Sequence, residues 1–192
     1  MTKLYLVRHG QDAGHSHENN DPGLSELGHQ QAAEMAATLA PLGPLSVIVS
    51  PLCRTRETAQ PLETAWNVAG DVVPAIREIP SPSNELDQRR QWLRRTMAGT
   101  WNDIAQTEPW LLPWRQALLD TLLGAQQDTV VVSHFVAINV AVGSAQNDGR
   151  LTLFRPNNCS ITIMETDGTN LSLLELGEAL EMSYRHSTCS GF

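Results

Sequence analysis

Three short apolar runs, each followed by a segment with helical signals, constrain most strongly what this chain can fold into. The runs are rich in β-branched and other apolar residues and cover residues 3–7, 45–49 and 129–132. Strands that alternate with helices in this way form a parallel sheet flanked by helices. The pattern therefore predicts an α/β fold.

Further segments predict the remaining elements. Ser25 is a possible N-cap for a helix that ends near Ala40, because Pro41 follows. The turn signal Asp167-Gly168 separates two strand-like runs, 159–165 and 170–176, which we expect to close one edge of the sheet. The other expected helices are 54–66, 113–123 and 135–142.

The length of 192 residues fits one domain, so we treat residues 1–192 as a single unit. Residues 79–113 differ from the rest of the chain. They open with Pro80-Ser81-Pro82-Ser83, continue with a charged helix and carry three tryptophans. This segment is predicted to be a helical cap over the strand ends, with a plain surface insertion as the alternative.

Composition excludes several classes of protein. Hydrophobic residues make up 41% and charged residues 18%, and no apolar run approaches the ~20 residues that cross a bilayer. The N-terminus lacks the pattern of a secretory signal, so a cytoplasmic location is the expectation. A net charge of −8 disfavours nucleic acid and anionic membranes as partners. Three cysteines without a C-x-x-C pair indicate neither disulfides nor a thiolate zinc site.

Polar groups follow each of the three main runs. They are Arg8-His9-Gly10, then a segment from Ser50 to Arg54, then Ser133-His134. The carboxyl ends of parallel strands lie at one edge of the sheet, where such folds bind ligands. A neutral imidazole can attack phosphorus, and arginine presents a planar fork that matches two phosphoryl oxygens. The three groups together predict a site for a small phosphorylated substrate.

The order of these motifs resembles that of the histidine phosphatase superfamily, also called the phosphoglycerate mutase-like family. The matching segments are 6–10 (LVRHG), 21–28 (DPGLSELG), 50–59 (SPLCRTRETA) and 132–134 (VSH). The resemblance covers roughly residues 3–145. It implies a three-layer sandwich around a central, mostly parallel mixed sheet.

The resemblance also implies roles for individual residues. His9 would be the phosphorylated nucleophile, with Arg8, Arg54 and His134 around the transferred phosphoryl group. Glu78 matches the position of the proton donor in the mutase-like branch, although the usual glycine- and tryptophan-containing continuation is absent. Glu85 is the second candidate for that role. Arg56 is expected to point away from the site.

A further departure from the family follows the first motif, where many members carry an asparagine and this chain has His15. A contact between His15 and the substrate is one interpretation. His15, His17 and Glu18 could alternatively bind zinc, although a solvated loop is the simpler expectation and we predict no metal site.

The predicted function is hydrolysis of a phosphomonoester or related phosphoryl compound through a phosphohistidine, without a cofactor. A phosphoglycerate mutase-like phosphotransferase and a non-catalytic phosphate-binding or interaction module are the alternatives. Neither the substrate nor the oligomeric state follows from the sequence. Five arginines, Arg77, Arg89, Arg90, Arg94 and Arg95, could select a second anionic group or simply solvate a helix, and solvation is the favoured interpretation.

Overall fold

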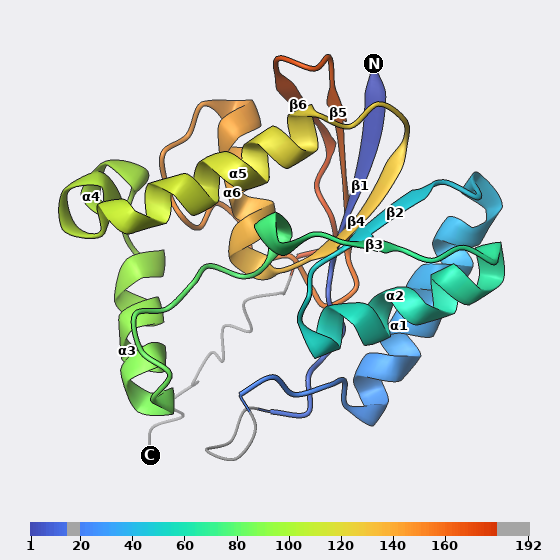
Figure 1. Ribbon diagram of the computed structural model, residues 1–192, viewed down its shortest axis with the longest axis horizontal. Coiled ribbons are helices and arrows are strands. Elements are labelled where there is room, and N and C mark those ends of the chain that lie inside the picture. The colour runs from blue at the N-terminus through green and yellow to red at the C-terminus, as the bar shows by residue number, and fades with distance from the viewer. Residues whose placement is uncertain (15–19, 180–192) are drawn as a thin grey trace, which may run out of the picture.

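The computed structural model describes residues 1–14 and 20–179 and contains a six-stranded mixed sheet in the order β3-β2-β4-β1-β5-β6 (Figure 1). Strands β1 to β4 run parallel, whereas β5 is antiparallel to both β1 and β6. The strands are β1 (Thr2–Arg8), β2 (Ser46–Val49), β3 (Asp71–Val72), β4 (Thr129–Ser133), β5 (Ile161–Thr166) and β6 (Leu171–Glu175).

Helices cover both faces of this sheet (Figure 1). Helices α1 and α2 lie on one face, and α5 and α6 lie on the other. The helices are α1 (Glu26–Leu39), α2 (Cys53–Trp66), α3 (Leu86–Met97), α4 (Trp101–Thr107), α5 (Leu112–Leu123) and α6 (Phe135–Gln146). Short 3-10 turns are η1 (Ala40–Leu42), η2 (Pro74–Ile76) and η3 (Pro109–Leu111).

Alternating side chains of β1 divide the core into two parts. Leu4 and Leu6 pack toward α5 and α6, whereas Tyr5 and Val7 pack toward α1 and α2. A central strand that is buried on both faces has a nearly continuous apolar sequence, and residues 3–7 show this pattern. The predicted three-layer α/β fold with a mostly parallel mixed sheet is confirmed.

The ends of the helices follow from local chemistry. Ser25 caps α1, and its Oγ accepts a hydrogen bond of 3.1 Å from the backbone N–H of Gly28. Asn67 and Asn147 end α2 and α6 with φ values of 53° and 52°, the left-handed conformation that asparagine tolerates. Helix α6 is longer than the predicted 135–142.

Strand β3, which precedes the segment that carries Glu78, has only two residues. Only Asp71 and Val72 pair with β2, because Pro74 begins the 3-10 turn η2. Proline lacks the N–H that a strand donates, so pairing ends before it. Glu78 therefore follows an irregular segment.

Residues 79–113 contain α3, α4 and η3 at one side of the molecule (Figure 1). Trp92 and Trp101 are buried in the core, and Trp110 stacks on Trp92 with ring centroids 6.3 Å apart. These contacts give the three tryptophans of the segment a packing role. The single domain and the capping role of this segment stay predictions. Among the described residues, no helix combines the length and apolar character that crossing a membrane requires.

Candidate active site

Strands β1, β2 and β4 end side by side at the same edge of the sheet. Arg8, the last residue of β1, lies opposite Ser133, the last residue of β4. On the other side of β4, Val49 lies opposite Val132. The next residues along each strand therefore meet at the carboxyl edge, where parallel sheets bind ligands.

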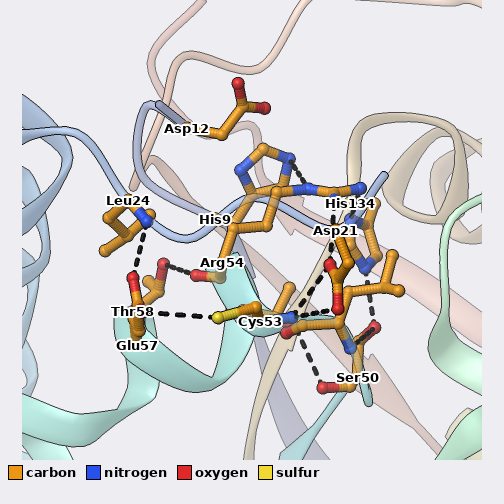
Figure 2. Close-up of polar contacts among 12 residues, drawn as sticks. His9, Asp12, Asp21, Leu24, Ser50, Cys53, Arg54, Glu57, Thr58 and His134 are labelled. Carbon is orange, nitrogen blue, oxygen red and sulfur yellow. Dashed lines mark hydrogen bonds and ion pairs between the residues drawn. The ribbon is translucent and has the colours of Figure 1, made fainter. Parts of the chain in front are cut away.

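His9 is buried at this edge and has a defined tautomer (Figure 2). Its Nδ1 lies 2.7 Å from the carbonyl oxygen of Gly10. A carbonyl can only accept, so Nδ1 carries the proton. The Nε2 atom is then unprotonated, and it accepts a hydrogen bond of 3.2 Å from Nε of Arg54. The backbone is fixed as well, because Asn158 Nδ2 donates to the carbonyl oxygen of His9 at 2.9 Å.

His134 lies on the other side of the Arg54 guanidinium (Figure 2). Its Nδ1 accepts from Nη2 of Arg54 at 3.3 Å, and its Nε2 donates to Ser50 Oγ at 2.7 Å. Burial is the main cause that lowers the pKa of His134 well below its usual value, and the positive charge of Arg54 acts in the same direction. His134 is therefore a neutral imidazole near pH 7.

Arg54 is 3% exposed and is the second residue of α2, directly after Cys53. Its Nη1 lies 3.6 Å from Oδ1 of Asp21, whose two carboxylate oxygens also accept from the backbone N–H of Cys53 at 3.1 and 3.0 Å. Burial lowers the pKa of Arg54, and the carboxylate of Glu78 acts in the opposite direction. Arginine stays charged throughout, so a buried positive charge faces His9.

Arg8 adds a second guanidinium to the site. Its Nη1 donates to the carbonyl oxygen of Pro156 at 2.8 Å, and its Cζ lies 5.5 Å from the centre of the Phe135 ring. Within the described residues, Nε of Arg8 is buried and has no hydrogen-bond partner. Burial lowers the pKa of Arg8, an effect that Glu78 opposes. An unused donor on a buried cation favours an anionic ligand.

The side chain of Glu78 lies beside the N-terminal end of α6. Its Oε1 accepts hydrogen bonds from the backbone N–H groups of Ile79 at 3.0 Å and Val136 at 3.2 Å. Burial raises the pKa of Glu78, whereas the two N–H groups and the charges of Arg54 and Arg8 lower it. The net shift is upward, so this carboxyl holds a proton at higher pH than an ordinary glutamate.

A cavity of about 340 Å³ opens beside Arg54 and Glu78. Its walls come from the segment before α2, from the segment that carries Glu78 and from the first part of the 79–113 region. The lining residues are Asn20, Asp21, Leu52, Arg54, Arg77, Glu78, Ile79, Pro80, Ser81, Ser83, Asn84 and Arg89.

Comparisons with known proteins fit this geometry. The model of the histidine phosphatase superfamily (branch 1) matches residues 4–179. The chain belongs to this superfamily. A probable phosphoglycerate mutase GpmB from Erwinia tasmaniensis is 32% identical over 186 residues, which cover 84% of each protein. A corresponding protein from Enterobacter is 28% identical, again over 84% of each protein.

Solved structures of other proteins share the fold. YhfR of Bacillus stearothermophilus matches with a TM-score of 0.73 at 20% identity, covering 94% of this chain and 98% of that one. Phosphoserine phosphatase from Entamoeba histolytica, solved with 3-phosphoglyceric acid, matches with a TM-score of 0.70 at 22% identity and covers 93% and 98%. Membership of the family supports phosphatase or mutase chemistry for this chain.

The structure brings together five of the residues that the sequence predicted for the site: Arg8, His9, Arg54, Glu78 and His134. Their catalytic roles stay predictions. His15, with the zinc alternative built on it, His17 and Glu18, lies outside the described residues.

Two further side chains lie away from the cavity. Glu85 is exposed at the N-cap of α3 and does not line the cavity. Arg56 is exposed and lines a separate hollow of about 570 Å³ with Cys53 and Glu57. The position of Arg56 agrees with the expectation that it points elsewhere, and the position of Glu85 favours Glu78 as the acid.

Three contributors to the site were not singled out from the sequence. Ser50, Asp21 and Asn158 orient His134, Arg54 and His9 respectively. Ser50 and Asp21 fall within the matching motifs, so their position was a usable signal. Asn158 comes from a segment without a motif, 149 residues from His9, and only the fold brings the two together.

Gly10 lies where the loop after His9 approaches α1 closely. A Cβ at Gly10 would lie 2.7 Å from the carbonyl oxygen of Gly28, in the first turn of α1. A Cβ at Gly28 would lie 2.1 Å from the carbonyl oxygen of Gln11. The two glycines allow the loop after His9 to pack against α1, which holds the nucleophile in place.

Proposed function

We propose that this chain is a phosphatase that hydrolyses small phosphomonoesters in two steps through a phosphohistidine at His9, without a metal or cofactor. The observation that carries the proposal is the state of His9. The Gly10 carbonyl accepts the Nδ1 proton, so Nε2 is the unprotonated nitrogen, and it faces the charged Arg54, which donates to it. A nucleophile with a fixed tautomer needs no separate base to activate it.

In the first step, Nε2 of His9 attacks phosphorus, and the bond from phosphorus to the leaving oxygen breaks. Arg54 and Arg8 stabilise the charge on the equatorial oxygens. A doubly charged phosphoryl group also favours protonation of His134 at Nδ1, which can then donate a hydrogen bond to it. Glu78 gives its proton to the leaving oxygen, a role that suits a carboxyl group with a raised pKa.

In the second step, water attacks the phosphohistidine. Glu78, now a carboxylate, takes a proton from that water, and the bond between phosphorus and Nε2 of His9 breaks. Inorganic phosphate leaves, and both residues return to their starting protonation states. The proton that His134 takes up from solvent with the phosphoryl group returns to solvent when phosphate leaves, and Glu78 carries the other proton in both steps.

The curated relatives named as probable mutases favour a second candidate, in which the phosphohistidine passes its phosphoryl group to another hydroxyl. A mutase must retain the intermediate until an acceptor arrives, whereas a phosphatase releases inorganic phosphate. Measuring phosphate release from phosphoglycerates, alongside interconversion of their isomers, separates the two. Phosphate release faster than isomerisation is the expected result.

The decisive experiment is capture of the intermediate. Mixing with p-nitrophenyl phosphate and quenching in alkali within milliseconds should leave a phosphoryl group on the protein, and mass spectrometry should place it on His9. His9→Ala should abolish labelling and lower turnover by roughly 10³-fold or more. His29→Ala is the matched control, because His29 is an exposed histidine on α1.

Two results would contradict the proposal. Full turnover by His9→Ala would exclude His9 as the nucleophile. Binding of phosphate without turnover or labelling in the unmodified protein would favour the non-catalytic alternative. The cytoplasmic location stays a prediction, as does the choice of a small phosphorylated molecule as the partner.

A further inference from the structure

The loop after β1 carries His9 on two successive peptide groups, and both are held by side chains from other elements. These peptides join His9 to Gly10 and Gly10 to Gln11. The carbonyl oxygen of Gly10 accepts the Nδ1 proton of His9, so the orientation of the loop decides which ring nitrogen is unprotonated. Side chains that hold these peptides therefore act on the nucleophile through the backbone.

The peptide group between His9 and Gly10 is bound at both of its polar atoms. Its carbonyl oxygen accepts from Nδ2 of Asn158 at 2.9 Å, and its N–H donates to Oγ1 of Thr58 at 3.0 Å. Thr58 is 0% exposed, and its hydroxyl donates to the carbonyl oxygen of Arg54 at 2.6 Å (Figure 2). Rotation of this peptide would break a buried hydrogen bond and leave a buried N–H without an acceptor.

The next peptide group, between Gly10 and Gln11, is held in the same way. Its carbonyl oxygen faces Nδ1 of His9 at 2.7 Å, and its N–H donates to Oε1 of Gln31 at 2.9 Å. Gln31 lies in the second turn of α1. Because a peptide group is planar, a hydrogen bond to its N–H also fixes the direction of its carbonyl. Gln31 thus aims the acceptor that selects the tautomer of His9.

The three supporting side chains come from separate parts of the fold. Gln31 belongs to α1, Thr58 belongs to α2, and Asn158 lies shortly before β5. In the described part of the chain, none of the three is among the residues that line the cavity beside Arg54 and Glu78. They can therefore orient the nucleophile without competing with a substrate for its binding groups.

The segment that carries Asn158 follows the end of β1 closely. The backbone N–H of Cys159 donates to the carbonyl oxygen of Arg8 at 2.9 Å, and the N–H of Arg8 donates to the carbonyl oxygen of Ser160 at 3.3 Å. Cys159 has a φ of 57°, in the left-handed region that a residue with a Cβ rarely occupies. Such a conformation persists where the surrounding contacts hold it. The chain accepts this local strain directly beside the side chain that binds the His9 carbonyl.

We propose that Gln31, Thr58 and Asn158 are positioning residues, which act through the two peptide groups to keep Nε2 of His9 unprotonated and aligned with phosphorus. This inference rests on the proposed function for the role of Nε2. A displacement of about 1 Å can lower the rate of a reaction by about 100-fold, even when its cause lies away from the reacting atoms. The support of the nucleophile is therefore part of its reactivity.

Variants of Gln31 that keep its length test the second peptide. Gln31→Met lacks a strong acceptor, and the maximal rate of His9 phosphorylation by p-nitrophenyl phosphate, measured by rapid quench, should fall by about 3- to 10-fold. The substrate concentration for half-maximal rate should change little. Gln31→Glu keeps an oxygen that accepts from Gln11 and should restore most of the rate. Gln30→Met is the matched control, because Gln30 is exposed and bonds to none of the described residues through its side chain.

Variants of Thr58 test the first peptide. Thr58→Val keeps the shape but leaves the N–H of Gly10 without an acceptor, and the same rate should fall by about 10- to 100-fold. Thr58→Ser keeps the hydroxyl and should retain most of the rate. Thr64→Val is the matched control. Thr64 also lies on α2 and donates to the carbonyl oxygen four residues earlier, at 2.9 Å, but it is exposed. Its replacement should leave the rate unchanged.

Nitrogen-15 NMR of the His9 ring distinguishes positioning from general damage to the fold. The signals are assigned by comparison with His9→Ala. In the unmodified protein, Nδ1 should give the shift of a protonated nitrogen and Nε2 that of an unprotonated one. In Gln31→Met, well below its melting temperature, part of the population should carry the proton on Nε2, and Gln31→Glu should reverse this. A lower melting temperature with an unchanged His9 spectrum and rate would overturn the positioning role.

The two readouts separate this inference from the proposed function. A changed His9 tautomer in Gln31→Met, together with no phosphohistidine in the unmodified protein, would overturn the phosphatase and keep the control of the His9 ring. Phosphorylation of His9 at equal rates in the unmodified protein, Gln31→Met and Thr58→Val would overturn the positioning role and keep the phosphatase. Equal losses of rate in Gln31→Met and Gln30→Met would also overturn the positioning role.

Discussion

Replacing Glu78 by glutamine separates its chemical role from its structural one. The amide oxygen of glutamine can accept the same two hydrogen bonds, from the N–H groups of Ile79 and Val136, and the side-chain volume is nearly unchanged. What Glu78→Gln loses is the transferable proton and the charge. Any large effect on turnover therefore reports acid–base catalysis.

The size of the effect should depend on the leaving group. An alkoxide is strongly basic and must be protonated as it departs, so turnover of 2-hydroxyethyl phosphate should fall by the ~10²–10⁴-fold typical of general acid–base catalysis. A nitrophenolate leaves without a proton, so phosphorylation of His9 by p-nitrophenyl phosphate should suffer much less. Dephosphorylation should then become the slow step, because Glu78 also activates water. Stopped-flow absorbance should show a burst of nitrophenol.

Glu78→Gln should lower turnover but raise the stability of the fold. The pKa of Glu78 is higher in the folded protein than its ordinary value, so the folded state binds more protons than the unfolded state between these two values. The free energy of unfolding consequently falls as pH rises through that interval. Above the folded pKa, burial of the charged carboxylate destabilises the folded state to its full extent. Glu78→Gln removes this cost, so urea denaturation at pH 8 should give a higher midpoint for the variant.

Glu85→Gln is the matched control, because Glu85 is exposed outside the cavity. It should change neither substrate's turnover. Equal losses on the alkyl and aryl phosphates in Glu78→Gln, without a burst, would mean that Glu78 is structural. If Glu85→Gln showed the leaving-group dependence instead, the proton donor would be Glu85, at the start of α3.

Other predictions concern the metal, His134 and the glycine contact. Exhaustive chelation should leave turnover of p-nitrophenyl phosphate intact, because guanidinium groups supply the charge a metal would bring; loss that zinc restores would refute this. The pKa of His134 is lowered on folding, so stability should fall as pH drops below about 6.5, and His134→Asn should remove that loss in urea titrations at pH 7.5 and 5.5. Gly28→Ala places a Cβ 2.1 Å from the Gln11 carbonyl and should lower the free energy of unfolding by about 1–3 kcal/mol, whereas Gly149→Ala, with open space around it, should not.

The fold could be predicted largely from local patterns. Alternating strands and helices, the Ser25 cap and the Asp167-Gly168 turn are all present where the sequence indicates them. The buried run at β1 and the polar groups after the strands then place His9 and His134 at one edge by topology alone. Strand β3 is short because Pro74, which has no N–H to donate to a neighbouring strand, begins a 3-10 turn within an apolar run that otherwise resembles a strand.

The orientation of the site could not be predicted in the same way. The tautomers of His9 and His134 depend on a backbone carbonyl at Gly10 and a hydroxyl at Ser50, and no residue pattern encodes which nitrogen faces which partner. The partner of Glu78 is the N-terminus of α6, a contact that the sequence did not indicate. Such contacts depend on distances between elements, which only the assembled fold fixes.

The partners of Arg54 explain why the site favours an anion. Two of its nitrogens donate to neutral imidazoles, of His9 and His134, and its carboxylate contact, with Asp21, is longer at 3.6 Å. Neutral acceptors satisfy the donors of a buried guanidinium without cancelling its charge, so burial still lowers the pKa of Arg54. A close carboxylate would have neutralised this charge and then competed with phosphate. Because imidazoles hold the guanidinium instead, the same geometry that orients the nucleophile leaves the positive charge available to the phosphoryl group that it attacks.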